Sequence, residues 1–120
     1  MTITVWHLST CSTCSRILKE LGLSDSNATL KDIKTDPVTK EELESMKANV
    51  GSYKALINGR SMQFRTMDKK ARDLGEDEAK ELLLSHYAFL KRPVIKIDDT
   101  YFVGNSKKIV AAAKSKLNHD

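Results

Sequence analysis

The sequence predicts an α/β protein: a four-stranded mixed sheet with helices on its faces, interrupted by a helical lobe. A strand–helix–strand pattern opens the chain over residues 2–33, and two strands followed by a helix close it over residues 94–117. Between them, residues 37–90 carry mostly helical patterns. A chain of 120 residues has room for one compact core and little room for a second. We therefore expect residues 1–120 to form a single domain, with the helical insert at approximately 37–90.

The first three elements follow from hydrophobic patterning. Residues 2–8 alternate in character and are rich in β-branched and aromatic side chains, which predicts a strand. The helical spacing of apolar residues over 14–21 predicts a helix that stops at Gly22. Residues 28–33 are expected to form a second strand, with Leu30 and Ile33 facing inward. Strands joined in this way through a helix are parallel and have a right-handed crossover.

The insert opens with a helix start signal. Thr39 and Glu42 have the spacing of a capping box, which predicts a helix directly after them. A short helix is expected over 62–67. A longer helix is expected to begin at Gly75 or Asp77, because the following apolar residues form one stripe at helical spacing. The stripe consists of Ala79, Leu82, Leu83, Tyr87 and Leu90.

The last part of the chain predicts a hairpin and a helix. Residues 94–97 and 100–103 are β-branched and aromatic, and the Asp98-Asp99 pair between them is a tight-turn signal. Ser106 then stands where a helix cap is needed. The helix after it carries its apolar residues on one side: Ile109, Val110, Ala113 and Leu117.

Charge and hydropathy exclude several classes of protein. The net charge is +4, and acidic and basic residues are interspersed, which is typical of a solvated surface. Four lysines gather on the last helix, but no aromatic residues lie among them to stack on bases, so we expect no direct binding of nucleic acid. No apolar run approaches the ~20 residues that cross a bilayer. Residues 1–10 also lack a secretion signal, and we expect a cytoplasmic protein.

The two cysteines are the informative feature of the sequence. Cys11 and Cys14 lie three residues apart, between the first predicted strand and its helix. The N-terminus of a helix presents unpaired N–H groups and a partial positive charge, which can lower the pKa of a thiol there. At this spacing the two sulfurs can also form a disulfide. Either Cys11 attacks a substrate and Cys14 resolves the product, or the pair acts as a redox sensor.

Two other interpretations of the cysteines are weaker. A free cysteine can be an inert, buried apolar residue, but two of them beside a strand-to-helix turn favour chemistry. A metal site would use His7 with Cys11 and Cys14, whereas a structural zinc takes four ligands. The chain has no second pair of this kind. We therefore expect no metal.

Several motifs together resemble the ArsC/Spx family, which comprises thioredoxin-fold arsenate reductases, their uncharacterised relatives and the Spx transcription regulators. The resemblance covers essentially the whole chain and implies a thioredoxin-like, or glutaredoxin-like, fold. It rests on the spacing of a few residues along the chain. They are His7, Cys11 and Cys14 after the first strand, Arg60 after Leu56-Ile57-Asn58-Gly59, and Arg92-Pro93 before the hairpin.

The resemblance implies a role for each of these residues. Cys11 matches the nucleophile that attacks arsenate, and His7 matches a histidine whose positive field favours the thiolate. Arg60 and Arg92 match two arginines that hold the oxyanion, and their planar fork of donors suits that task. Pro93 matches a cis-proline that faces the active cysteine. No bound cofactor is implied, because glutathione with glutaredoxin, or thioredoxin, supplies the electrons.

The sequence also departs from the reductases. They carry a further arginine after the hairpin, where this chain has residues 103–106, and commonly a serine at the position of Cys14. Both departures are closer to the Spx-like branch and to the uncharacterised relatives. Spx regulators bind the C-terminal domain of the RNA polymerase α subunit through an interface that includes a glycine, for which Gly51 is the candidate here. An arsenate-reductase-like enzyme is the first expectation, and a redox-sensing polymerase-binding regulator is the alternative.

Overall fold

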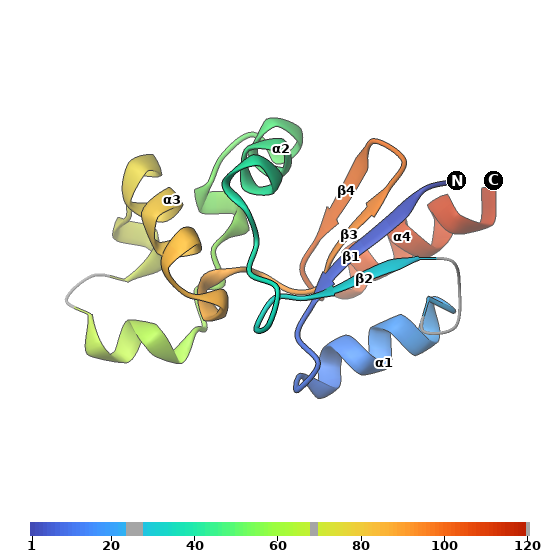
Figure 1. The fold of residues 1–120 in the computed structure, drawn as a ribbon, viewed down its shortest axis with the longest axis horizontal. Coiled ribbons are helices and arrows are strands. Elements are labelled where there is room, and N and C mark those ends of the chain that lie inside the picture. Colours follow the sequence, from blue (N-terminus) through green and yellow to red (C-terminus); the bar gives the residue numbers. More distant parts are fainter. Residues whose placement is uncertain (24–27, 68–69, 120) are drawn as a thin grey trace. The chain divides into compact units, whose positions relative to one another are not determined.

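The computed structural model describes residues 1–23, 28–67 and 70–119. Two compact units make up the chain (Figure 1). The first joins Met1–Asp36 to Arg92–Asp120, and the second is Pro37–Lys91. Residues 68–69 of the second unit lie outside the described part.

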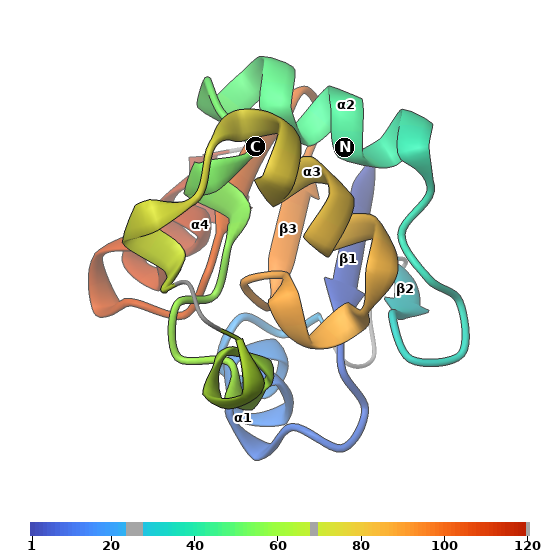
Figure 2. The same ribbon diagram turned by 90° about the vertical axis from the view of Figure 1, so that its left-hand side faces the viewer.

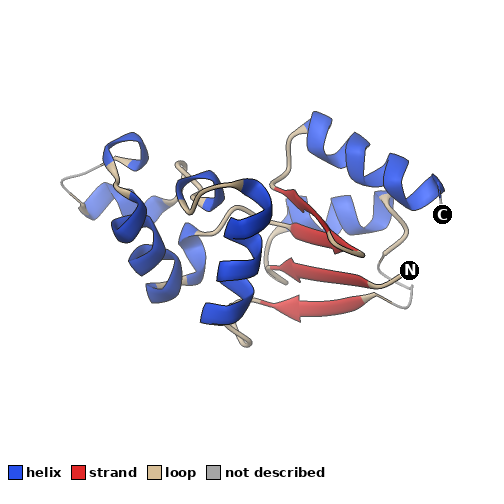
Figure 3. Ribbon diagram, turned by 90° about the horizontal axis from the view of Figure 1, so that it is seen from above, coloured by secondary structure: helices blue, strands red, loops and turns tan. Residues whose placement is uncertain are grey.

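The first unit contains the sheet. Its strands are β1 (Ile3–His7), β2 (Thr29–Asp32), β3 (Val94–Ile97) and β4 (Thr100–Val103), in the order β2-β1-β3-β4 (Figure 1). Figure 3 shows these strands side by side in red. β1 and β2 are parallel, while β3 is antiparallel to both of its neighbours. This confirms the four-stranded mixed sheet, the parallel opening unit and the closing hairpin.

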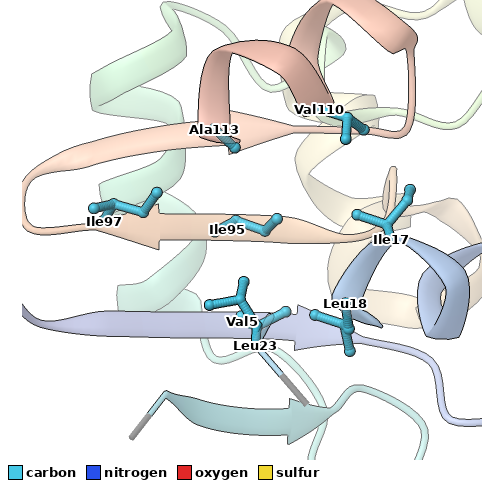
Figure 4. Packing of buried hydrophobic residues seen from close by; sticks show 8 residues of the cluster. All are labelled: Val5, Ile17, Leu18, Leu23, Ile95, Ile97, Val110 and Ala113. Atoms are coloured by element: carbon cyan, nitrogen blue, oxygen red, sulfur yellow. The ribbon is translucent and has the colours of Figure 1, made fainter. Parts of the chain in front are cut away.

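Two helices pack on one face of this sheet. They are α1 (Ser12–Glu20) and α4 (Lys107–His119). The core between them and the strands is apolar and buried (Figure 4). It consists of Val5, Ile17, Leu18, Leu23, Ile95, Ile97, Val110 and Ala113. Burying each large aliphatic side chain stabilises the fold by roughly 1.5–3 kcal/mol. The predicted cap of α4 is present, because the Ile109 N–H donates to Ser106 Oγ at 3.2 Å.

The expectation that Leu30 and Ile33 both face inward was half wrong. Ile33 is 1% exposed, but Leu30 is 39% exposed. Side chains three residues apart along a strand point to opposite faces, so one continuous strand cannot bury both on the same side. Leu30 pairs with the buried Val5, but it lies on the edge strand of the sheet. An edge strand has a neighbour on one side only, which leaves the flank of this side chain open to solvent.

The second unit is built from helices (Figure 2). Its α-helices are α2 (Lys40–Val50) and α3 (Glu76–Ser85). Its 3₁₀ turns are η1 (Lys54–Leu56), η2 (Met62–Thr66), η3 (Ala71–Asp73) and η4 (Tyr87–Phe89). The predicted capping box of α2 is confirmed in both directions: the Glu42 N–H donates to Thr39 Oγ1 at 3.1 Å, and the Thr39 N–H donates to Glu42 Oε1 at 2.9 Å.

The helix predicted to begin at Gly75 or Asp77 and to continue through Leu90 begins at Glu76 and ends earlier than expected, at Ser85. The backbone of His86 is extended, and its Nδ1 atom accepts a hydrogen bond from the Ala88 N–H at 2.9 Å. This bond starts the separate turn η4. The apolar stripe continued through the break, which is why periodicity alone did not locate the end of the helix.

Within the described residues, no helix has both the length and the apolar character needed to cross a membrane.

Candidate thiol site

Cys11 lies at the junction of β1 and α1. It is the N-cap residue of α1, with an extended backbone (φ −92°, ψ 113°), so the helix begins at Ser12 and Cys14 is its third residue. A backbone bond from the Cys11 N–H to the Leu8 carbonyl oxygen, 3.0 Å long, closes the loop between strand and helix. The first N–H groups of a helix have no partner within it, and they lie next to the N-cap side chain. The fold therefore places the sulfur of Cys11 beside the positive end of α1.

The surroundings of Cys11 favour its thiolate. The partial burial of this side chain would raise its pKa. That effect is outweighed by the Cys14 backbone N–H and thiol and by the Arg92 guanidinium, which lower it through hydrogen bonds and charge. The net result is a pKa of Cys11 below the usual value for a thiol. The side chain keeps partial contact with solvent, so an ionised sulfur here can be reached.

Cys14 has the opposite character. It is fully buried, and this burial raises its pKa to about 11, with the neighbouring charge of Cys11 acting in the same direction. A backbone hydrogen bond at Leu8 and the charge of Arg92 compensate only in part. Both cysteines are free thiols in this structure. At neutral pH the pair therefore combines an accessible, easily ionised sulfur with a buried, protonated one.

Arg92 approaches the thiols from the segment just before β3. The first residue of that strand, Val94, pairs with Trp6 near the end of β1, which leads into the cysteine loop. The peptide bond between Arg92 and Pro93 is cis. The side chain is half-buried, and its Nε and Nη1 atoms are buried without a hydrogen-bond partner in the described part of the chain.

Buried donors without a partner are costly for a protein, and they are rare. A guanidinium in this state can donate two further hydrogen bonds, a geometry that suits an oxyanion. Arg92 thus supplies a positive charge next to Cys11 together with unused donors, which is what a thiolate attacking an anionic substrate requires.

His7 lies beside Asp32 in the sheet. It is the last residue of β1, is half-buried, and lies level with Asp32 in the parallel register. The main cause of a lowered pKa at Asp32 is the hydrogen bond from the Ser9 hydroxyl, and the charge of His7 adds to it. Among the described residues, the side chains that shift the pKa of Cys11 are Cys14 and Arg92.

Sequence reasoning did not single out Ser9, which lies in the loop before Cys11, or Asp32, which accepts a hydrogen bond from it. An aspartate at the end of a strand is an ordinary turn signal, so nothing in the sequence marked it. The pairing depends on the parallel alignment of β1 and β2, which only the folded sheet provides.

Arg60 belongs to the second unit. It follows Gly59 in a turn, where its backbone N–H donates to Asn58 Oδ1 at 3.1 Å, and its side chain is exposed. Within the described residues, no cluster of three histidine, cysteine or acidic side chains is arranged to hold a metal ion.

The sequence was compared with protein families and with known proteins. A model of the ArsC family matches residues 6–113. An uncharacterised protein of Haemophilus influenzae is 28% identical over 112 residues, which cover 92% of this chain and 97% of that protein.

Solved structures share the fold. The YffB (PA3664) protein is similar, with a TM-score of 0.74 and 27% identity, over 93% of this chain and 98% of the other. An arsenate reductase from Vibrio cholerae has a TM-score of 0.77 at 16% identity, over 94% of this chain and 98% of the other. At 16% identity, the similarity to the Vibrio cholerae protein shows only that the two proteins share a fold.

Proposed function

The chain belongs to the ArsC family and is a thiol redox protein, and from this premise we propose that it reduces a small oxyanion of the arsenate type with Cys11 as the nucleophile. The observation that carries the proposal is the pairing of an activated Cys11 with the unpartnered Nε and Nη1 atoms of Arg92. An enzyme of this kind must bind an anion and attack it with another anion. A buried guanidinium beside the sulfur reduces the repulsion between the two.

In the first proposed step, the thiolate of Cys11 attacks the arsenic atom. A sulfur–arsenic bond forms, and one oxygen of arsenate leaves as water after taking up two protons. Arg92 holds the remaining oxygens through its free donors. The family resemblance adds Arg60 as a second cation for the same anion, and this assignment rests on the resemblance alone.

In the second step, another thiol attacks the sulfur of Cys11. A disulfide forms, and the electron pair of the sulfur–arsenic bond passes to arsenic, so that As(V) becomes As(III) and two thiols are oxidised. The attacking thiol is either Cys14 or glutathione. Because the pKa of Cys14 is about 11, its thiol must lose a proton as it attacks, whereas glutathione arrives from solvent. Glutaredoxin or thioredoxin then reduces the disulfide.

The test is arsenite formation from arsenate with glutathione and glutaredoxin as reductants. We expect Cys11→Ser to lose all turnover above background. Cys14→Ser is the matched control: it keeps turnover if glutathione resolves the intermediate and loses it if Cys14 does. Turnover in Cys11→Ser equal to that of the wild type would refute the proposal.

The alternative is a redox-sensing regulator of the Spx type that binds the C-terminal domain of the RNA polymerase α subunit. The observation in its favour is the closeness of two thiols whose pKa values are shifted in opposite directions, which suits a reversible disulfide. Gly51, the candidate interface residue, is exposed and ends α2 in a left-handed conformation (φ 99°). A pull-down with the purified α domain, using reduced and oxidised protein, distinguishes this function from the reductase. Binding that depends on the oxidation state supports the regulator.

A further inference from the structure

The carboxylate of Asp32 is bonded to the loop that leads to Cys11. Its Oδ2 atom accepts a hydrogen bond from Ser9 Oγ at 2.5 Å, and its Oδ1 atom accepts one from the Ser9 N–H at 3.4 Å. Oδ1 also accepts a bond from the Lys34 N–H at 3.2 Å. One side chain at the end of β2 therefore joins the turn after β2 to the loop after β1.

The backbone around this link is fixed on both sides. The Ile33 N–H donates to the carbonyl oxygen of His7 at 2.8 Å, which continues the β1–β2 pairing as far as the loop. The Cys11 N–H donates to Leu8 at 3.0 Å, which closes the loop at its other end. Ser9 lies between these two bonds, only two residues before the cysteine. Because Ser9 lies within this short loop, we expect a change in its position to move the backbone that carries Cys11.

We propose that Asp32 is a positioning residue for Cys11: by holding Ser9, it fixes the β1–α1 loop that carries this thiol at the N-terminus of α1. This inference rests on the proposed function only for its catalytic meaning. The geometry it describes concerns the ionisation of Cys11, which is measured without any substrate.

The charge of Asp32 acts against this positioning effect. A negative charge near a thiol disfavours the thiolate and raises its pKa. If Asp32 acted on Cys11 through its electric field alone, its removal would make the thiol more acidic. If Asp32 acts by holding the loop in place, loss of its bond to Ser9 makes the Cys11 thiol less acidic, because the sulfur moves away from the groups that lower its pKa. The two effects have opposite signs, so one measurement separates them.

The experiment is the rate of alkylation of the full-length protein by iodoacetamide between pH 5 and 9, where the buried Cys14 thiol stays protonated. Ser9→Ala removes the hydroxyl donor and leaves every charge in place. We expect it to raise the pKa of Cys11 and to slow alkylation at pH 6 about threefold, which corresponds to a shift of roughly half a unit. Ser9→Thr keeps a hydroxyl and is expected to restore the wild-type profile.

Asp32→Ala is expected to shift the profile in the same direction as Ser9→Ala, although it removes a negative charge. The matched control is Asp36→Asn, which removes the same charge from an exposed position on the same turn and leaves the Ser9 link intact. An unchanged profile in Ser9→Ala, or a more acidic Cys11 in Asp32→Ala, would overturn the proposal. If the profiles shift as expected but arsenate is not reduced, the positioning role stands and the proposed function fails.

Discussion

Cys11 and Cys14 share one turn of α1, yet their thiols are shifted in opposite directions. Both sulfurs lose solvent on burial, which raises their pKa. For Cys11, at the N-cap, hydrogen bonds from Cys14 and from Arg92 exceed that effect and lower the pKa. For Cys14, which is completely buried, they do not, and its pKa rises to about 11. Two identical side chains thus acquire different acidities: the pKa of the N-cap thiol is lowered, and that of the buried thiol is raised.

The first prediction concerns the two thiols separately. Iodoacetamide should modify Cys14→Ser, in which Cys11 remains, with a rate that reaches half its maximum below pH 9.0, the usual value for a thiol. Cys11→Ser, in which only the buried thiol remains, should stay unmodified at neutral pH. The reason is that only the thiolate reacts, and the pKa of Cys14 is far above 7. Equal alkylation rates for the two variants at pH 7 would contradict the assignment.

The second prediction is that Arg92 supports activity at the expense of stability. Arg92→Met removes the charge and the unpartnered buried donors while keeping much of the side-chain volume. Losing hydrogen bonds to a charged group costs about 1.5–3 kcal/mol, so the KM for arsenate should rise roughly 10- to 100-fold. The same variant should unfold at a higher urea concentration than the wild type, because the unpaired donors are gone.

The control for Arg92 is Lys91→Met, which removes a cation from the adjacent, exposed position. We expect neither the KM nor the urea midpoint to change in that variant. If Arg92→Met destabilised the protein as much as it weakened arsenate binding, Arg92 would be a structural residue instead.

The third prediction tests Arg60, whose proposed role in binding the anion rests on the family resemblance. Arg60→Ala should raise the KM for arsenate, because it removes a proposed cation for the anion. Arg65→Ala is the matched control, since Arg65 is an exposed arginine in the nearby turn η2 of the same unit. Steady-state kinetics of the two variants decide the matter. The same KM in both would remove Arg60 from the proposed site.

Much of this fold could be predicted from the sequence because its signals are local. The capping box at Thr39 and Glu42 and the cap at Ser106 depend only on residues three positions apart, and all were found as expected. The signals for the hairpin were also local, because a tight turn joins β3 directly to β4.

The errors arose where distant residues decide the outcome. Leu30 has a strand-like neighbourhood, but its exposure depends on which strand forms the edge of the sheet. The helix α3 stops because the His86 ring accepts a backbone bond, although the apolar period continues. In the thiol site, the cysteines and Arg92 could be recognised in the sequence as a motif. The Ser9–Asp32 hydrogen bond could not be predicted, because it joins residues 23 positions apart through the pairing of two strands.

The fourth prediction concerns the core of the first unit. Ile97→Ala should lower the free energy of unfolding by about 2–5 kcal/mol, because Ile97 is fully buried and its truncation leaves a cavity. Leu30→Ala removes a side chain of the same size from the edge strand, where it is 39% exposed, and should cost much less. Urea unfolding of both variants measures the difference. Equal losses would mean that the edge of the sheet is covered in solution.

The fifth prediction follows from the raised pKa of Cys14. The folded state prefers the protonated thiol, so this preference is fully present below the usual value of 9.0 and is lost as the pH rises through about 11. A shift of this size corresponds to roughly 3 kcal/mol. The wild type should therefore lose more stability than Cys14→Ala between pH 8.5 and pH 11. The two proteins differ only at residue 14, so the difference between their urea midpoints reports the loss of this thiol. Parallel losses in the two proteins would show that this thiol is not desolvated in solution.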